Sequence, residues 1–208
     1  PRVWPAIFVG AFLVNVTTTG SVLTSLGIAI GNTLEGRLSA ELGRLFANGR
    51  SVFNRAQDAL KFVVLAGLFS TTVGATIGAS SLTLGGNAGW RDYPAIWFTW
   101  WLGDAVGALV VGPLLVLWCE RLEMPRSRWR VLEGAGLFAV LLTVGTFVFC
   151  GFVGQPLTFF CLPPLIWAAF RFGQRETTAA IALLSVPAIW GTVRGLGPFA
   201  GASPNESL

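Results

Sequence analysis

The sequence predicts an all-helical membrane protein in which about seven transmembrane helices form a single bundle. The chain of 208 residues is 53% hydrophobic and only 12% charged, with a mean hydropathy of +0.68. A water-soluble domain of this size carries about 25% charged residues. The apolar residues also form long unbroken runs, whereas a transmembrane β-barrel alternates apolar and polar residues in segments of ~10. Both observations favour helices with lipid as their solvent.

Seven apolar segments make up most of the chain, and an untilted transmembrane helix needs ~20 residues. They cover residues 3–16, 21–45, 62–84, 94–118, 132–152, 157–172 and 177–193. The first and sixth segments are short. We expect them to span the membrane nonetheless, because the charges of the loops alternate regularly only if all seven segments cross it.

Basic residues are concentrated in every second loop. Most of the 14 lysines and arginines lie in three regions, around Arg50, Arg126 and Arg175, whereas the opposite side has only Arg91 and Arg194. Positively charged loops stay in the cytoplasm. The sequence therefore predicts a multi-pass protein of the bacterial inner (plasma) membrane with these three loops cytoplasmic. The net charge of +4 is explained by this asymmetry, so no nucleic-acid partner is expected.

Three polar residues are the candidate site for sensing a signal or ligand: Asn32, Glu35 and Asp104. Asp104 lies roughly 14 Å and Asn32 roughly 17 Å below the outer ends of their segments, at a rise of 1.5 Å per residue. Glu35 lies one turn from Asn32 on the same helix face. A carboxylate at such depth must face the bundle interior and find partners. We expect the three side chains to form a buried cluster; polar contacts that merely hold helices together are an equally weighted alternative.

Small residues four positions apart predict close helix packing. The sequence contains three such glycine pairs: Gly27 and Gly31, Gly74 and Gly78, and Gly103 and Gly107. Hydroxyl side chains share the segment of the second pair. We expect them mainly to bond back to their own helix rather than line a pocket. These hydroxyl residues are Ser70, Thr71, Thr72, Thr76 and Ser80.

Prolines Pro163, Pro164 and Pro187 predict helix kinks, because proline removes a backbone donor and bends a helix. A broken helix that binds a substrate, as in transporters, is the less favoured interpretation. A disulfide between Cys150 and Cys161 is conceivable, because both residues fall near the outer ends of their segments.

The sequence contains no set of residues that predicts catalysis. It has no histidine and no C-x-x-C pair, so we expect no metal site. A phosphate-binding G-x-x-x-x-G-K-[ST] loop and a G-x-S-x-G nucleophile elbow are also missing from the sequence. We therefore expect no enzyme activity and no cofactor in this segment.

Four stretches resemble the MASE1 family of membrane-associated sensor domains in bacterial signalling proteins. The most specific is Trp101-Leu-Gly-Asp-Ala, which contains Asp104. The others are Trp4-Pro-Ala-Ile-Phe-Val-Gly-Ala-Phe with Asn15, Gly31-Asn-Thr-Leu-Glu, and Trp167-Ala-Ala-Phe-Arg-Phe-Gly. The resemblance implies a single sensor domain over residues 1–208 that controls a cytoplasmic histidine kinase or diguanylate cyclase. Against the family pattern, we expect the chain to lack the earliest helices, the last helix and the output domain.

Within this interpretation, the polar cluster receives the signal and Trp101 and Arg171 orient their helices. The expected partners are the lipid bilayer, an unidentified small ligand or membrane signal, and a covalently linked output domain, with a homodimer left open. Two other functions stay open. The chain could be a transporter or channel with Asp104 in the pathway, or a membrane anchor without sensing.

Overall fold

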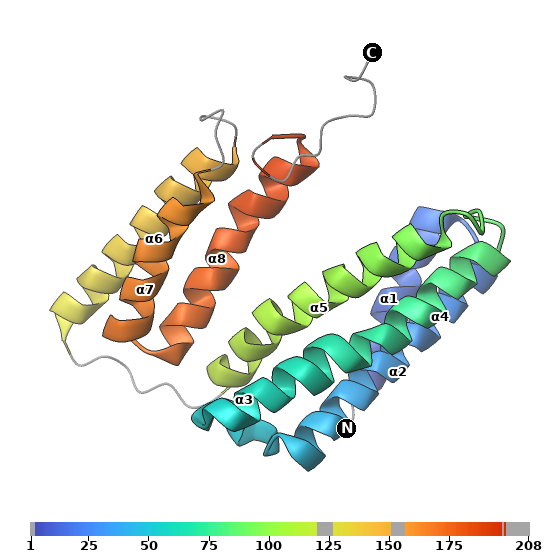
Figure 1. Cartoon of the computed structure of the whole chain (residues 1–208), viewed down its shortest axis with the longest axis horizontal. Coiled ribbons are helices and arrows are strands. Elements are labelled where there is room, and N and C mark those ends of the chain that lie inside the picture. The colour runs from blue at the N-terminus through green and yellow to red at the C-terminus, as the bar shows by residue number, and fades with distance from the viewer. Residues whose placement is uncertain (1–2, 120–126, 151–156, 197, 199–208) are drawn as a thin grey trace. The chain divides into compact units, whose positions relative to one another are not determined.

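The computed structural model describes residues 3–119, 127–150, 157–196 and 198, and it consists of helices without a strand in this part of the chain (Figure 1). The chain divides into two compact units, Pro1–Gly112 and Pro113–Leu208. Helix α5 (Tyr93–Trp118) begins in the first unit and ends in the second. The all-helical prediction is therefore confirmed for the described residues.

The first unit begins with a helical hairpin whose turn follows from local sequence. Helix α1 (Trp4–Thr19) ends at Gly20, which has a φ of 67°, a left-handed conformation that glycine adopts without steric cost. Ser21 then caps α2 (Val22–Phe46), because its side chain accepts a hydrogen bond from the Thr24 amide. The two helices lie side by side (Figure 1).

A long, composite helix follows the short 3₁₀ segment η1 (Gly49–Asn54). It consists of α3 (Ala56–Phe62), a π-helical segment η2 (Val63–Phe69) and α4 (Ser70–Leu84). Helix α4 packs along α2, and the loop after it returns to the start of α2, where Asn87 Nδ2 donates a 3.0 Å hydrogen bond to Thr24 Oγ1. Sequence hydropathy places the start of this helix at residue 62, six residues late. Hydropathy detects only the apolar part of the helix, whereas the helix itself begins earlier, in the more polar segment Ala56–Phe62.

The second unit contains α6 (Arg128–Phe149), a 3₁₀ turn η3 (Thr158–Cys161), α7 (Leu162–Arg171) and α8 (Gln174–Val193). Its interior combines large apolar side chains of α6 with small residues of α7 and α8. Leu137 and Leu141 of α6 pack with Ala168 of α7 and Ala180 of α8, and all four are fully buried. Further along α6, Val148 and Phe149 pack with Cys161.

Each of the seven predicted segments corresponds to a helix of the described chain, but spanning is supported for only some of them. Within the residues that the structure describes, four helices are long and apolar enough to cross a membrane: Ala56–Leu84, Tyr93–Trp118, Arg128–Phe149 and Gln174–Val193. Trp4–Thr19 and Thr158–Arg171 are apolar but shorter. Helix α2 has 25 residues and carries Glu35, Arg37, Glu41 and Arg44 in its second half. Seven membrane spans therefore stay a prediction.

Candidate functional site

The polar residues predicted to form a cluster lie on α2 and α5 of the first unit. Glu35 extends from α2 over Gly74 of α4, where a side chain would coincide with the Glu35 carboxylate. The missing side chain at Gly74 is what makes room for this carboxyl group. Glu35 and Asp104 lie close enough for their charges to repel each other. The structure thus brings together two acidic residues that lie 69 positions apart in the sequence.

Two atoms of the predicted cluster are buried without a hydrogen-bond partner among the described residues: Asn32 Oδ1 and Asp104 Oδ2. Both are acceptors when the aspartate is ionised. Most buried polar atoms in proteins have a partner, and an unpartnered one costs about 1–3 kcal/mol. Asn32 lies one turn before Glu35 on α2, and Glu35 in turn lies within reach of the charge of Asp104 on α5.

Glycines line the contact between α2 and α4. A Cβ atom at Gly31 would lie 3.0 Å from the Ile77 side chain, and one at Gly27 would lie 2.9 Å from Ser81 Cβ. Against α5, a Cβ at Gly78 would lie 2.7 Å from the Trp100 ring. An added Cβ would force a neighbouring side chain to shift at Gly27 and Gly78, and the Ile77 side chain would have to give by a few tenths of an ångström at Gly31, so glycine favours the observed approach at all three positions.

The third glycine pair is in a different environment. A Cβ atom at Gly103 or Gly107 of α5 would have no atom of the described chain, outside the local helix, within 4 Å. In this structure the two glycines therefore leave open space beside α5 instead of supporting a helix contact. A packing role for them stays a prediction.

Helix α5 is attached to the preceding helix by aromatic side chains at positions one turn apart. Tyr93 Oη lies 3.2 Å from Ser80 Oγ, and Trp97 Nε1 donates a 3.0 Å hydrogen bond to Thr76 Oγ1. Trp101 Nε1 donates a 3.0 Å hydrogen bond to the backbone carbonyl of Leu68, inside the π-helical segment.

Sequence reasoning predicted an orienting role for Trp101 but did not reveal these bonds. The spacing of positions 93, 97 and 101, which places them on one helix face, is the signal that could have revealed them. The rings of Trp97 and Trp101 also stack, with centroids 6.1 Å apart and an interplanar angle of 6°.

The hydroxyl groups of α4 mostly bond to their own helix, as predicted. Ser70, Thr71, Thr72 and Thr76 each donate to a carbonyl three to five residues earlier. Thr76 also accepts the bond from Trp97, and Ser80 pairs with Tyr93, so the hydroxyl groups bond to their own helix or to α5 and not to one another.

In the second unit, Arg171 at the end of α7 forms a bidentate ion pair with Glu133 of α6, at 2.7 Å and 2.9 Å. Paired guanidinium–carboxylate bonds of this kind fix geometry as well as charge. Arg175 at the start of α8 donates to the Leu117 carbonyl at 3.0 Å and lies 5.5 Å from the centroid of the Trp118 ring. These contacts support an orienting role for Arg171, which stays a prediction.

The prolines of the second unit occupy two different settings. Pro163 and Pro164 lie in the first turn of α7, directly after η3, where a missing backbone donor costs nothing. Pro187 lies inside α8 and is buried, and a Cβ at Gly145 of α6 would lie 3.0 Å from its ring. Pro187 is thus part of the packing between α6 and α8.

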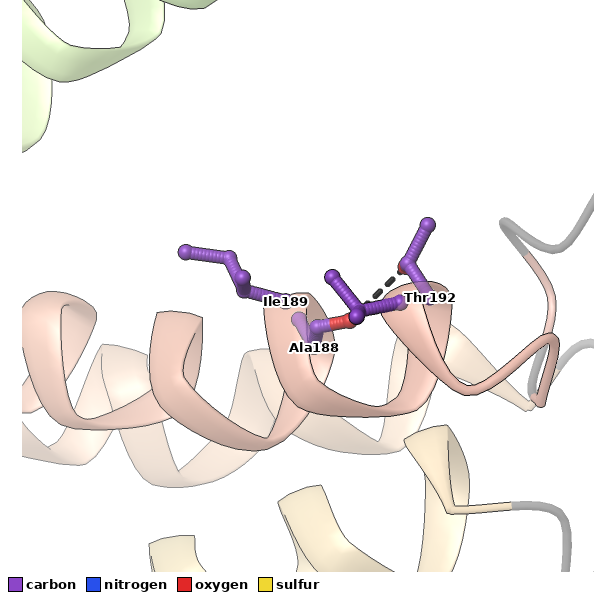
Figure 2. Close-up of a pocket in the computed structure, with 4 residues that line it drawn as sticks. Ala188, Ile189 and Thr192 are labelled. Atoms are coloured by element: carbon purple, nitrogen blue, oxygen red, sulfur yellow. Dashed lines mark hydrogen bonds between the residues drawn. The ribbon is translucent and has the colours of Figure 1, made fainter. Parts of the chain in front are cut away.

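One pocket on the described residues lies on α8. It has a volume of about 240 Å³ and is lined by Ala188, Ile189, Thr192 and Val193. Figure 2 shows that these residues share one helix, and that the Thr192 hydroxyl is bonded to the Ala188 carbonyl, at 2.8 Å. A shallow, apolar depression on one helix offers a ligand no convergent polar groups, so it is a poor candidate for a binding site.

The remaining predictions concern residues that the structure describes only in part. Cys119, Cys150 and Cys161 all carry free thiols, so a bond between Cys150 and Cys161 is not formed in this structure. In the described part of the chain, no group of three or more His, Cys, Asp or Glu residues is arranged to hold a metal ion. Arg121 and Arg126, which belong to a predicted cytoplasmic loop, lie outside the described residues.

The described residues form an all-helical protein with four helices that are long and apolar enough to cross a membrane. The chain belongs to the MASE1 family, whose sequence model matches residues 1–208. MASE1 is a family of membrane-associated sensor domains of signalling proteins, and it is sensory rather than catalytic. The resemblance inferred from the four sequence stretches is therefore confirmed. No curated protein and no solved structure matches this chain.

Proposed function

We propose that this chain is the input domain of a bacterial signalling protein in the inner membrane, and that the signal is received at Asn32, Glu35 and Asp104. The observation that carries the proposal is the pair of buried, unpartnered acceptor atoms on Asn32 and Asp104 beside the Glu35 carboxyl group. Polar groups buried in an apolar bundle are costly. A costly arrangement of this kind commonly marks a functional site, since packing alone would be served better by apolar residues.

The chemistry of the cluster restricts the signal it can receive. Two carboxyl groups and an amide oxygen offer acceptors, and Glu35 and Asp104 repel each other when both are ionised. A stimulus that brings positive charge or hydrogen-bond donors would relieve this repulsion. With the repulsion relieved, the arrangement of α2 and α5 that brings Glu35 and Asp104 closest together would become more favourable than the alternative arrangement.

Transmission requires two arrangements of the same helices. A ligand shifts their populations only if it binds one of them more tightly. Because Glu35 is on α2 and Asp104 is on α5, a change in their separation moves one helix relative to the other. We propose that this movement controls a cytoplasmic output, either a histidine kinase or a diguanylate cyclase, on the side of the Arg50, Arg126 and Arg175 loops.

The experiment joins the chain to a cytoplasmic diguanylate cyclase and measures cyclic di-GMP in cells. Glu35→Gln and Asp104→Asn each remove one of the repelling charges, and we expect each to shift the output at least about fivefold, the lower end of typical allosteric coupling. Glu41→Gln is the matched control, because Glu41 is on the same helix but exposed and paired with Arg44 at 2.7 Å. Unchanged output and unchanged stability in Asp104→Asn would refute the proposal.

A transporter or channel is the second candidate, and the observation that favours it is the acidic residue Asp104 within an apolar helix. Purified chain in proteoliposomes tests it directly. Cation flux that disappears in Asp104→Asn but persists in Glu41→Gln would support transport, whereas a sensor shows no flux in any variant. A plain anchor would instead leave output regulation intact when the chain is exchanged for an unrelated helical bundle.

A further inference from the structure

The long helix from Ala56 to Leu84 contains an irregular segment between its two α-helical parts. Residues Val63–Phe69 form a π-helix, in which the Ser70 amide bonds to the Leu65 carbonyl, five residues earlier. An α-helix would make this bond over four residues. π-Helical turns are rare, less favourable than α-helix, and concentrated at functional sites.

Three side chains stabilise this irregular backbone. Ser70 Oγ donates a 2.7 Å hydrogen bond to the Leu65 carbonyl, and Thr71 Oγ1 lies 3.0 Å from the carbonyls of Gly67 and Leu68. Both hydroxyl residues are fully buried. The third side chain comes from another helix: Trp101 of α5 donates to the same Leu68 carbonyl at 3.0 Å. The π-helical segment is thus held partly by a residue outside it.

The position of Trp101 links this segment to the proposed signal site. Trp101 precedes Asp104 by three residues on α5, which is one helical turn. A movement of α5 that changes the position of Asp104 therefore also moves the indole that contacts Leu68. On the other side, α4 carries Gly74, over which the Glu35 carboxylate lies, only four residues after Ser70.

We propose that the π-helical segment Val63–Phe69 is a register switch, held in its π form by the hydrogen bond from Trp101 to the Leu68 carbonyl. The inference rests on the proposed sensor function. When α5 moves, Leu68 loses that bond and the segment relaxes to α-helix. The extra residue of the π turn is then taken into the α-helical register, which rotates the helix before the segment by about 100° relative to the helix after it. Helix α3, which precedes the segment, thereby turns against α2.

Trp101→Phe tests the switch, because it keeps an aromatic ring but removes the indole N–H. Trp97→Phe is the matched control. It lies one turn away on the same face, and its N–H bonds to a threonine hydroxyl instead of the π-helical backbone. Both are made in the full chain with its cysteines replaced by serine, in lipid nanodiscs. Spin labels at Leu60 of α3 and Leu45 of α2, both exposed, report the rotation by electron paramagnetic resonance.

We expect Trp101→Phe to move the main label distance by roughly 5–8 Å, the displacement of a point on a helix surface turned through about 100°. Trp97→Phe should leave it unchanged. Deletion of the exposed residue Val64 removes the extra residue of the π turn while α3 and α4 keep their register, so it should leave the label distance near the wild-type value and prevent Trp101→Phe from shifting it. A wild-type distance in Trp101→Phe, or equal shifts in Trp101→Phe and Trp97→Phe, would overturn the proposal.

This measurement needs neither the natural stimulus nor an output domain, so its failure differs from a failure of the proposed function. A wild-type label distance in Trp101→Phe rejects the switch even if Asp104→Asn alters cyclase output. Conversely, unaltered cyclase output in Asp104→Asn rejects the sensor site, and with it the signalling role assigned to the switch.

Discussion

The two units of the chain differ in the side chains that lie between their helices. In the first unit, most buried residues are small or carry hydroxyl groups, such as Ala29, Ala75 and Thr71, although Ile28 and Val52 are buried as well. In the second unit, the large side chains of Leu137, Leu141, Val148 and Phe149 fill much of the interior. Close backbone approach and interdigitated side chains are both routes to the dispersion energy that holds helices together in lipid.

This contrast indicates where helix movement is easier. Large interlocking side chains resist sliding, because every shift opens a cavity or forces a clash. A smooth surface of glycine, alanine and hydroxyl residues has fewer such obstacles. The polar cluster and the π-helical segment both lie in the first unit, which is the unit with the smoother contact. Substitutions in each unit can test whether the two differ as described.

The largest effect is expected from added volume in the first unit. Gly78→Leu places a side chain where the Trp100 ring now lies, and over-packing of this kind costs about 1–3 kcal/mol or more. Titration with a denaturing detergent, followed by far-ultraviolet circular dichroism, measures the free energy of unfolding. Gly103→Leu is the control, because open space surrounds Gly103 within the described chain. Equal losses in both variants would contradict the glycine contact.

In the second unit, removed volume should be the damaging change. Leu141 is fully buried, so Leu141→Ala leaves a cavity, and we expect a loss of about 2 kcal/mol in the same titration, near the lower end for buried leucine. Lipid rather than water surrounds the unfolded helices, which removes most of the hydrophobic component. Leu142→Ala changes the neighbouring residue, which is 42% exposed, and should have almost no effect.

A smaller effect is expected from the ion pair between α6 and α7. Arg171→Lys keeps the charge but loses the two-pronged contact with Glu133, so the melting temperature should fall by less than in Leu141→Ala. The exchanged pair Arg171→Glu with Glu133→Arg should recover part of the loss that either single change causes. If the exchanged pair is less stable than both single variants, the pair does not orient the two helices.

The smallest effect is expected from Trp97→Phe, which removes the hydrogen bond to Thr76. Hydrogen bonds between membrane helices average about 0.6 kcal/mol in double-mutant cycles. A cycle that combines Trp97→Phe with Thr76→Val should therefore yield a coupling energy of this order. A coupling near zero would show that the ring, and not its N–H, attaches α5 to α4.

Much of the helical layout could be predicted from hydropathy, while the contacts could not. The segment predicted over residues 94–118 corresponds to a helix at Tyr93–Trp118, because an apolar run with clear ends has few alternatives. The role of Gly103 could not be decided in the same way. Glycine spacing shows that one helix face is small, but not whether another helix lies against it.

The candidate site shows the same limit. The sequence indicated that Glu35 and Asp104 must face the interior, and the structure places them within reach of each other's charge. The ion pair of Arg171 with Glu133 joins residues 38 positions apart, which no local pattern reveals. The π-helical segment at Val63–Phe69 has no signature in composition, and the hydrogen bond that it receives from Trp101 comes from a helix more than 30 residues later in the chain.

Amino-acid composition and order are enough to establish that this protein is helical and that lipid surrounds it, because an apolar chain in a bilayer must satisfy its backbone hydrogen bonds within each helix. They also establish the family, through residues such as Trp101 and Asp104. The tertiary structure alone decides which helix faces contact each other. Rotation of a helix about its axis changes every contact it makes while leaving its own hydrogen bonds intact, so neighbouring helices, and not local sequence, fix that rotation.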